Sequence, residues 1–233
     1  MFFGLSLSAA ALAQTNPSII FALLDHLYVP YGFNEINTTE VVVTGYLPSP
    51  CYGAPEYKVR VNNDQVYIRM TTTRTQTADH RPNLCTDVAV PFTETLKIGR
   101  LNPGHYQVRI NEGSARAIMS TLDIARAKVN SVDEYPYAIV QYVEQNQTDM
   151  HFYLNGYVYS DCYVLDQVRY MSNQKDVLAV LPIMKQIRPT CPRKMIPYRV
   201  RIDPPLNSIP SPVFLLHVRS ADGHSVNFVG QKK

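Results

Sequence analysis

The sequence predicts an all-β protein built from two tandem β-sandwich domains, each closed by one disulfide. Three observations predict this fold. Short segments of alternating polar and apolar residues follow one another, turn residues separate them, and a cysteine-centred pattern occurs twice. The composition agrees, because the 233 residues include 16 tyrosines and 17 prolines but only 10 glycines. Tyrosine suits a half-buried pleated surface, whereas proline favours sheet edges and turns.

The first 13 residues predict a secretion signal. Phe2–Ala13 is apolar, and Ala11-Leu12-Ala13 before Gln14 has the Ala-x-Ala form of a cleavage site. No Lys or Arg precedes the apolar run, so a misassigned start codon or a buried strand is the alternative interpretation. No later run of about 18 apolar residues exists, so we expect no transmembrane segment after cleavage. A secreted or periplasmic location follows.

Residues 14–124 are the predicted first domain. It begins with an apolar lead-in over residues 17–33, and Asn62-Asn63-Asp64 is a turn between two strands of a hairpin. Pro91 is expected to break the chain between two strands. The predicted strands are Glu40–Tyr46, Tyr57–Val61, Gln65–Met70, Asp87–Val90, Thr95–Ile98, His105–Ile110 and Ala115–Ile124.

Residues 125–133 are the predicted linker, inside a segment, 120–133, that has room for one helical turn. Residues 134–233 are the predicted second domain. Its strands are expected at Tyr137–Val143, His151–Tyr159, Gln167–Met171, Val177–Met184, Met195–Ile202, Val213–Arg219 and His224–Val229. Short strands separated by frequent turns are typical of a sandwich or a barrel.

The repeat selects one disulfide pairing out of the three that Cys51, Cys85, Cys162 and Cys191 allow. Gly-Tyr-x4-Cys-Tyr occurs at Gly45–Tyr52 and again at Gly156–Tyr163. The other two cysteines are each followed, after five residues, by Pro and an aromatic residue. If each half is one folding unit, then Cys51 pairs with Cys85 and Cys162 with Cys191. An internal duplication is the inferred origin, and four free thiols in a reducing compartment are the alternative.

The first half also resembles secreted bacterial sandwich domains. The residues that carry the resemblance are Gly45–Tyr52, Cys85 with Pro91-Phe92, and Leu101–Asn111, which follows a Leu-x-x-Gly-x-Tyr-x-Val pattern. The second half matches more loosely, with Pro212 where the first half has Gly104. The resemblance implies an immunoglobulin-like fold and no particular activity, because sandwiches carry unrelated functions.

Catalytic, cofactor and metal motifs do not emerge from the sequence. The six histidines include no His-x-x-x-His or His-Glu-x-x-His spacing, and no Cys-x-x-Cys pair is present. Gly-x-Ser-x-Gly and a glycine-rich phosphate loop are also missing. We therefore expect no enzymatic activity, no cofactor and no metal, although a small hydrolase with an unrecognised site is one alternative.

Basic residues gather in one part of the second half. Residues 182–202 contain no acidic residue, and Arg199 and Arg201 alternate, so they share one face of a strand. The possible binding patch consists of Lys185, Arg188, Arg193, Lys194, Arg199 and Arg201. It could attract an anionic envelope component or an acidic protein, or it could simply be a solvated face.

The sequence thus predicts a non-enzymatic exported module that binds a protein or an envelope component through loops or an edge strand. The candidate contact loops are Thr71–Asn83 and Lys185–Lys194. No nucleic-acid partner is expected, and the oligomeric state is left open. The alternative function is inhibition of a secreted hydrolase by a disulfide-tethered loop.

Overall fold

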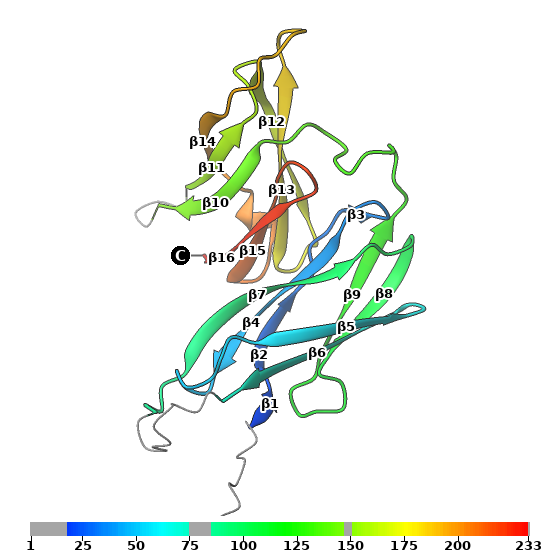
Figure 1. Cartoon of the computed structure of the whole chain (residues 1–233), viewed down its shortest axis with the longest axis vertical. Coiled ribbons are helices and arrows are strands. Elements are labelled where there is room, and N and C mark those ends of the chain that lie inside the picture. Colours follow the sequence, from blue (N-terminus) through cyan, green and yellow to red (C-terminus); the bar gives the residue numbers. More distant parts are fainter. Residues whose placement is uncertain (1–17, 75–84, 147–150, 233) are drawn as a thin grey trace, which may run out of the picture.

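A computed structural model of the chain describes residues 18–74, 85–146 and 151–232. Within these ranges all regular structure is β except one short 3-10 turn, η1 (Leu206–Ser208). Figure 1 shows the strands gathered into two units, which meet near the middle of the molecule. None of the described segments forms a helix long and apolar enough to span a membrane. The all-β prediction is confirmed.

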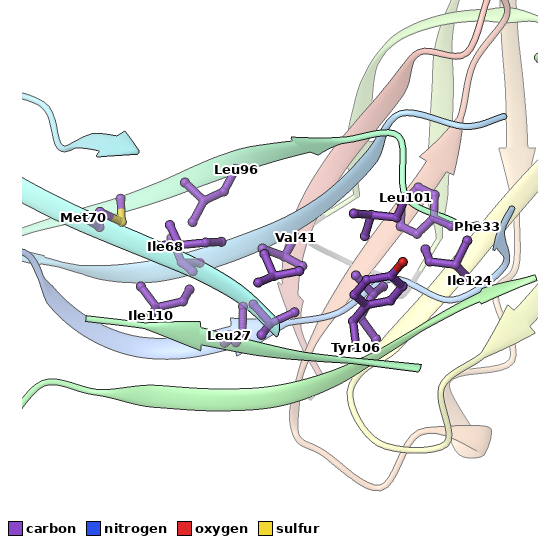
Figure 2. Packing of buried hydrophobic residues seen from close by; sticks show 14 of the residues in the cluster. Leu27, Phe33, Val41, Ile68, Met70, Leu96, Leu101, Tyr106, Ile110 and Ile124 are labelled. Atoms are coloured by element: carbon purple, nitrogen blue, oxygen red, sulfur yellow. The ribbon is translucent and has the colours of Figure 1, made fainter. Parts of the chain in front are cut away.

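The first unit is a sandwich of two sheets. The smaller sheet has the order β2-β4-β7, and the larger has the order β1-β6-β8-β9-β3 with β5 also paired to β6. The strands are β1 (Ile19–Phe21), β2 (Leu23–Tyr28), β3 (Phe33–Asn34), β4 (Thr39–Leu47), β5 (Glu56–Asn62), β6 (Gln65–Thr73), β7 (Val90–Gly99), β8 (Gly104–Ile110) and β9 (Ile118–Ala125). Apolar side chains of both sheets interdigitate between them, as Figure 2 shows for Val41, Ile68, Leu96 and Ile110.

The second unit is also a two-sheet sandwich, with the orders β10-β11-β14 and β12-β13-β15-β16. Phe152, Leu154, Phe214 and Leu216 are buried in its core. The strands are β10 (Ile139–Gln145), β11 (Phe152–Val158), β12 (Tyr163–Ser172), β13 (Val177–Gln186), β14 (Ile196–Ile202), β15 (Val213–Arg219) and β16 (Ser225–Gln231). The sandwich prediction is therefore confirmed for the fold of both halves.

Seven strands of one unit pair as the seven strands of the other do. β2, β4 and β7 correspond to β10, β11 and β14, whereas β5, β6, β8 and β9 correspond to β12, β13, β15 and β16. The pairs β6–β8 and β13–β15 are parallel and the other corresponding pairs are antiparallel. This parallel pair departs from the purely antiparallel sheets of immunoglobulin domains.

The repeated glycine marks a close backbone approach in both units. Gly45 pairs with Leu24 and Gly156 with Val140, and in each case a β-bulge follows in the partner strand. A Cβ atom on Gly45 would lie 2.2 Å from the Leu23 carbonyl oxygen, and one on Gly156 would lie 1.9 Å from that of Ile139. Only glycine leaves room for this approach.

Three details of the predicted elements are wrong. Residues 87–89, predicted as part of a strand, precede β7 and belong to no strand. β7 runs unbroken through Pro91, because β7 is an edge strand, where the missing N–H of proline removes no ladder bond. Residues 120–125 belong to β9, and the segment 126–138 contains neither a strand nor a helical turn. The predicted signal residues 1–13 and most of the loop Thr71–Asn83 lie outside the described residues.

The second unit packs against the outer face of the first unit's smaller sheet. Tyr28 and Val42 of the first unit contact Val177 and Leu215 of the second, all four of them buried. This contact explains why β4 is apolar on both faces: Val41 and Val43 face the core of their own unit, and Val42 faces the other unit.

Polar side chains join the two units inside this contact. Glu40, which is 5% exposed, accepts hydrogen bonds from Ser225 Oγ at 2.5 Å and Asn227 Nδ2 at 2.9 Å. Asn227 Nδ2 also lies 3.1 Å from Thr95 Oγ1. Next to them His217 Nδ1 lies 2.9 Å from Asn227 Oδ1, and burial lowers the pKa of His217 to about 4. The interface therefore contains a hydrogen-bonded polar network that fixes how the units meet.

Candidate functional site

The outer face of the β10-β11-β14 sheet is the counterpart of the face that the first unit buries. By strand register Tyr153 of β11 occupies the position of Val42 in β4, which is fully buried by the second unit. In the second unit the corresponding face is open to solvent. Tyr142 is 54% exposed, and the side chains of Arg199 and Arg201 are 56% and 50% exposed.

Three tyrosines and two arginines share this open face, which we call the tyrosine–arginine face. They project from adjacent strands, because Tyr153 lies opposite Arg201, and Asn155, between the tyrosines of β11, lies opposite both Tyr142 and Arg199. The members are Tyr142, Tyr153, Tyr157, Arg199 and Arg201.

Contacts within the face hold its side chains in place. The Arg199 guanidinium lies 3.8 Å from the centre of the Tyr153 ring, a cation–π contact. Its Nη2 atom lies 3.4 Å from Glu144 Oε2, and Asn155 Nδ2 donates to the same carboxylate at 3.5 Å. Fixed tyrosine and arginine side chains lose little conformational freedom on binding, and both residue types are enriched at the energetic centres of protein interfaces.

The six residues of the predicted basic patch fall into two groups. Arg199 and Arg201 lie on the tyrosine–arginine face, whereas Lys185, Arg188, Arg193 and Lys194 lie at the end of β13 and in the loop that follows it. Residues 182–202 contain no acid, but three of their arginines form ion pairs with acids from other parts of the second unit. Arg188 pairs with Asp161, Arg199 with Glu144 and Arg201 with Asp203. Among the described residues, Lys185, Arg193 and Lys194 form no ion pair.

The predicted cysteine pairing is confirmed in the first unit, where Cys51 and Cys85 form a disulfide with a Cα–Cα distance of 6.0 Å. Cys162 and Cys191 carry free thiols in this structure. The two thiols are neighbours. The pKa of the Cys191 thiol is raised first by its partial burial and then by a hydrogen bond with the Cys162 thiol. Cys162 Sγ lies 3.3 Å from the Thr190 carbonyl oxygen instead of being bonded to Cys191. The second bridge stays a prediction.

Comparison with known protein families identifies part of the first unit. The ORF11 beta-sandwich domain matches residues 41–119, from β4 to the start of β9. The match covers about a third of the chain and supports a β-sandwich domain there. No curated protein and no solved structure matches the chain.

Two of the surface clefts contain polar side chains. One of about 440 Å³ is lined by His151 and Asp203, whose Nδ1 and Oδ1 atoms are 2.6 Å apart. The pKa of Asp203 is lowered, chiefly by this hydrogen bond. The described residues that line this cleft carry no hydroxyl or thiol group. A second cleft of about 500 Å³ lies where the units meet, beside Tyr31 and Lys175. Within the described ranges no three His, Cys, Asp or Glu side chains are grouped to hold a metal ion.

Sequence reasoning found two members of the tyrosine–arginine face and missed the tyrosines. Tyr153 and Tyr157 alternate with Phe152, Leu154 and Val158, so the pattern already placed them on one side of a strand. Tyrosine is frequent throughout the chain, however, and alternation does not reveal which outer face another unit covers.

Proposed function

We propose that this protein is a non-enzymatic binding module and that it engages a protein partner through the tyrosine–arginine face. The observation that supports the proposal is a comparison of the two units of the same chain. The topologically equivalent face of the first unit, at Tyr28 and Val42, is the one that already binds a β-sheet, namely the sheet of the second unit.

Composition favours a protein partner for the open face. Val42 in the covered face is apolar and stays buried, as suits a permanent contact inside one chain. Its counterpart, Tyr153, lies under the Arg199 guanidinium and keeps a polar hydroxyl group. Aromatic residues and arginine are enriched in interfaces between proteins that also exist apart, because they are stable in water and still contribute strongly once desolvated.

We also propose that the protein is exported and works in an oxidising compartment, as a secreted or periplasmic protein. The Cys51–Cys85 bridge and the Ala11-Leu12-Ala13 pattern support this proposal, since disulfides persist mainly outside the reducing cytosol. Mass spectrometry of the protein from its native source should find Gln14 at the mature N-terminus. Cytosolic protein that retains Met1 would overturn it.

The internal repeat has a proposed origin as well. The repeated Gly-Tyr-x4-Cys-Tyr pattern and the shared pairing of seven strands support a tandem duplication of one sandwich unit. The alternative function, inhibition of a hydrolase, depends on a tethered loop whose residues 75–83 lie outside the described part of the chain.

The binding proposal is tested by quantitative affinity capture with three forms of the full chain. These are the natural protein, Tyr153→Ser combined with Arg199→Ser, and Tyr46→Ser as a matched control. Tyr46 is 46% exposed and occupies the position in the first unit that Tyr157 occupies in the second. We expect one protein to be enriched by the natural chain and the control and reduced at least about tenfold by the double variant.

Equal recovery by all three forms, with unchanged thermal stability, would refute the role of this face. The loss of one cation–π contact at the surface should lower stability by no more than about 1 kcal/mol, so the double variant is expected to fold. A chain that captures no protein at all would refute the function.

A further inference from the structure

The outer face of the first unit's larger sheet carries four cations in adjacent positions. On the antiparallel pair β5–β6, Lys58 lies directly opposite Arg69, and Arg60 lies opposite Tyr67. On the parallel pair β6–β8, Tyr67 is in register with Arg109. We call Lys58, Arg60, Arg69 and Arg109 the basic face.

Three of these cations are not neutralised by the protein itself. Lys58, Arg60 and Arg69 are exposed and form no ion pair with any described residue, whereas Arg109 pairs with Glu112. Like charges directly opposite each other on neighbouring strands destabilise a sheet, so the Lys58–Arg69 pair lowers the stability of the free protein. An external anion would remove that repulsion. Acids at the same face are Glu56 of β5, Glu112, which pairs with Arg109, and Asp123 of β9, which pairs with His105. They reduce the excess charge without cancelling it.

Aromatic rings hold two of the guanidinium groups over the sheet. Arg60 lies 5.0 Å from the centre of the Tyr67 ring, and Arg69 lies 5.4 Å from that of Phe21. A guanidinium held over a ring keeps its charge at a fixed height above the strands. The basic face is thus an array of charges on neighbouring strands, two of which are held over aromatic rings.

An exposed apolar side chain borders these charges. Met119 of β9 is in register with Arg109 on the same face and is 68% exposed. In the second unit the corresponding face of the larger sheet is covered by the first unit, and its residues are different. There the counterparts of Gln107 and Arg109 are Leu215 and His217, which are buried against the first unit.

We propose that the basic face binds the anionic surface of a phospholipid membrane. An array of cations, three of them exposed and unpaired, matches a surface of negative head groups. Each Lys or Arg near such a surface contributes about 1 kcal/mol to binding. The long, flexible Met119 side chain can enter the head-group region, which adds an apolar contribution that salt does not screen. This site is separate from the tyrosine–arginine face and requires no protein partner.

The test measures sedimentation of the full chain with vesicles of 70% phosphatidylcholine and 30% phosphatidylserine, beside vesicles of phosphatidylcholine alone. Lys58→Gln combined with Arg69→Gln removes two charges of the basic face. Lys185→Gln combined with Arg193→Gln removes two unpaired charges from the second unit and is the matched control. Removing about 1 kcal/mol per residue predicts that the first double variant binds roughly 30-fold more weakly, and the control binds unchanged.

Two further measurements sharpen the outcome. The first double variant should melt at the same temperature as the natural protein or higher, because the repulsion between Lys58 and Arg69 is removed, and so weaker binding would not reflect unfolding. Met119→Ser should reduce the binding that persists at high salt. Equal loss in the control double variant, equal binding to phosphatidylcholine alone, or tighter binding to a 20-nucleotide single-stranded DNA than to the anionic vesicles would each overturn the proposal.

Discussion

Asn227 of β16 donates a hydrogen bond from Nδ2 to Oε1 of Glu40 in β4, 2.9 Å away, and so joins the half-buried Asn227 of one unit to the buried Glu40 of the other. Glu40 receives a second hydrogen bond from Ser225, at the other unit's surface. A carboxylate taken out of water needs such donors, because an unsatisfied buried charge is costly. The polar pair therefore makes the contact between units specific as well as stable.

Replacing Asn227 by alanine should destabilise the protein by about 1–3 kcal/mol, because Glu40 and Thr95 would lose a donor inside the interface. Urea unfolding of the full chain measures this change. Asn207→Ala is the control, since Asn207 is exposed and its replacement should alter stability by less than about 0.5 kcal/mol. If both variants unfold at the same urea concentration, Asn227 does not contribute to the interface.

The free energy of unfolding should fall as the pH is lowered from 6.5 to about 4, because the buried His217 resists protonation in this range. Burial first, then Arg219, lowers the pKa of His217 from 6.5 to about 4, although Glu40 and Asn227 oppose the shift. Between pH 6.5 and 4 the unfolded chain binds the proton and the folded chain does not, so folding loses up to about 3 kcal/mol on acidification. Above pH 6.5 this contribution to the pH dependence is absent.

Thermal melts from pH 8 to pH 4 check this prediction. His217→Gln should flatten the acid side of the curve, because the variant has no proton to take up at this position. His105→Gln serves as the control, since the His105 side chain is 91% exposed. A curve that His217→Gln leaves unchanged would mean that another group causes the acid sensitivity.

Alanine at either repeated glycine should destabilise the protein by roughly 1–3 kcal/mol, because the added methyl group would overlap a carbonyl oxygen of the neighbouring strand. The positions are Gly45, beside Leu23, and Gly156, beside Ile139. Tyr46→Phe keeps the neighbouring backbone and changes only an exposed hydroxyl group, so its melting temperature should stay the same. Unchanged melting of Gly45→Ala would show that β2 and β4 are not held this close.

Breaking the Cys51–Cys85 bridge should remove roughly 4 kcal/mol of stability, because the bridge closes a loop between cysteines 34 positions apart in sequence. Chemical unfolding of a Cys51→Ser, Cys85→Ser double variant measures the loss. The same pair of changes at Cys162 and Cys191 should cost clearly less in protein that is kept reduced, since these two thiols are free and only the burial of the Cys162 side chain is at stake. A smaller effect in the first unit would indicate that the unfolded chain is already compact there.

Non-reducing peptide mapping of protein from its native source checks the predicted second bridge. We expect one peptide pair that contains Cys51 and Cys85 and another that contains Cys162 and Cys191, because the latter thiols are neighbours at corresponding places in the repeat. Cytosolic protein should lack the second pair. Cys51 found joined to Cys162 or Cys191 would contradict the pairing.

Much of the fold could be predicted because alternation is a local property. The segments around Tyr57, Gln65, His105 and Val213 alternate clearly, and the structure places β5, β6, β8 and β15 there. Pro91 misled the prediction because whether proline ends a strand depends on whether that strand lies at a sheet edge, which is a tertiary fact. The parallel pairs β6–β8 and β13–β15 were likewise not predictable, since the alternation of residues within a strand does not determine which strand it pairs with.

The amino-acid order by itself determined the strand periods, the repeat and the disulfide of the first unit, because each depends on spacing along the chain. The tertiary structure decided which of several outer faces meet. Val42 became core and its counterpart Tyr153 stayed at the surface because the second unit packs on one smaller sheet and leaves the other open. The outer face of a sheet can bind a partner only if no other part of the chain covers it. Which face is covered depends on how the two units pack, and the local residue pattern does not encode that packing.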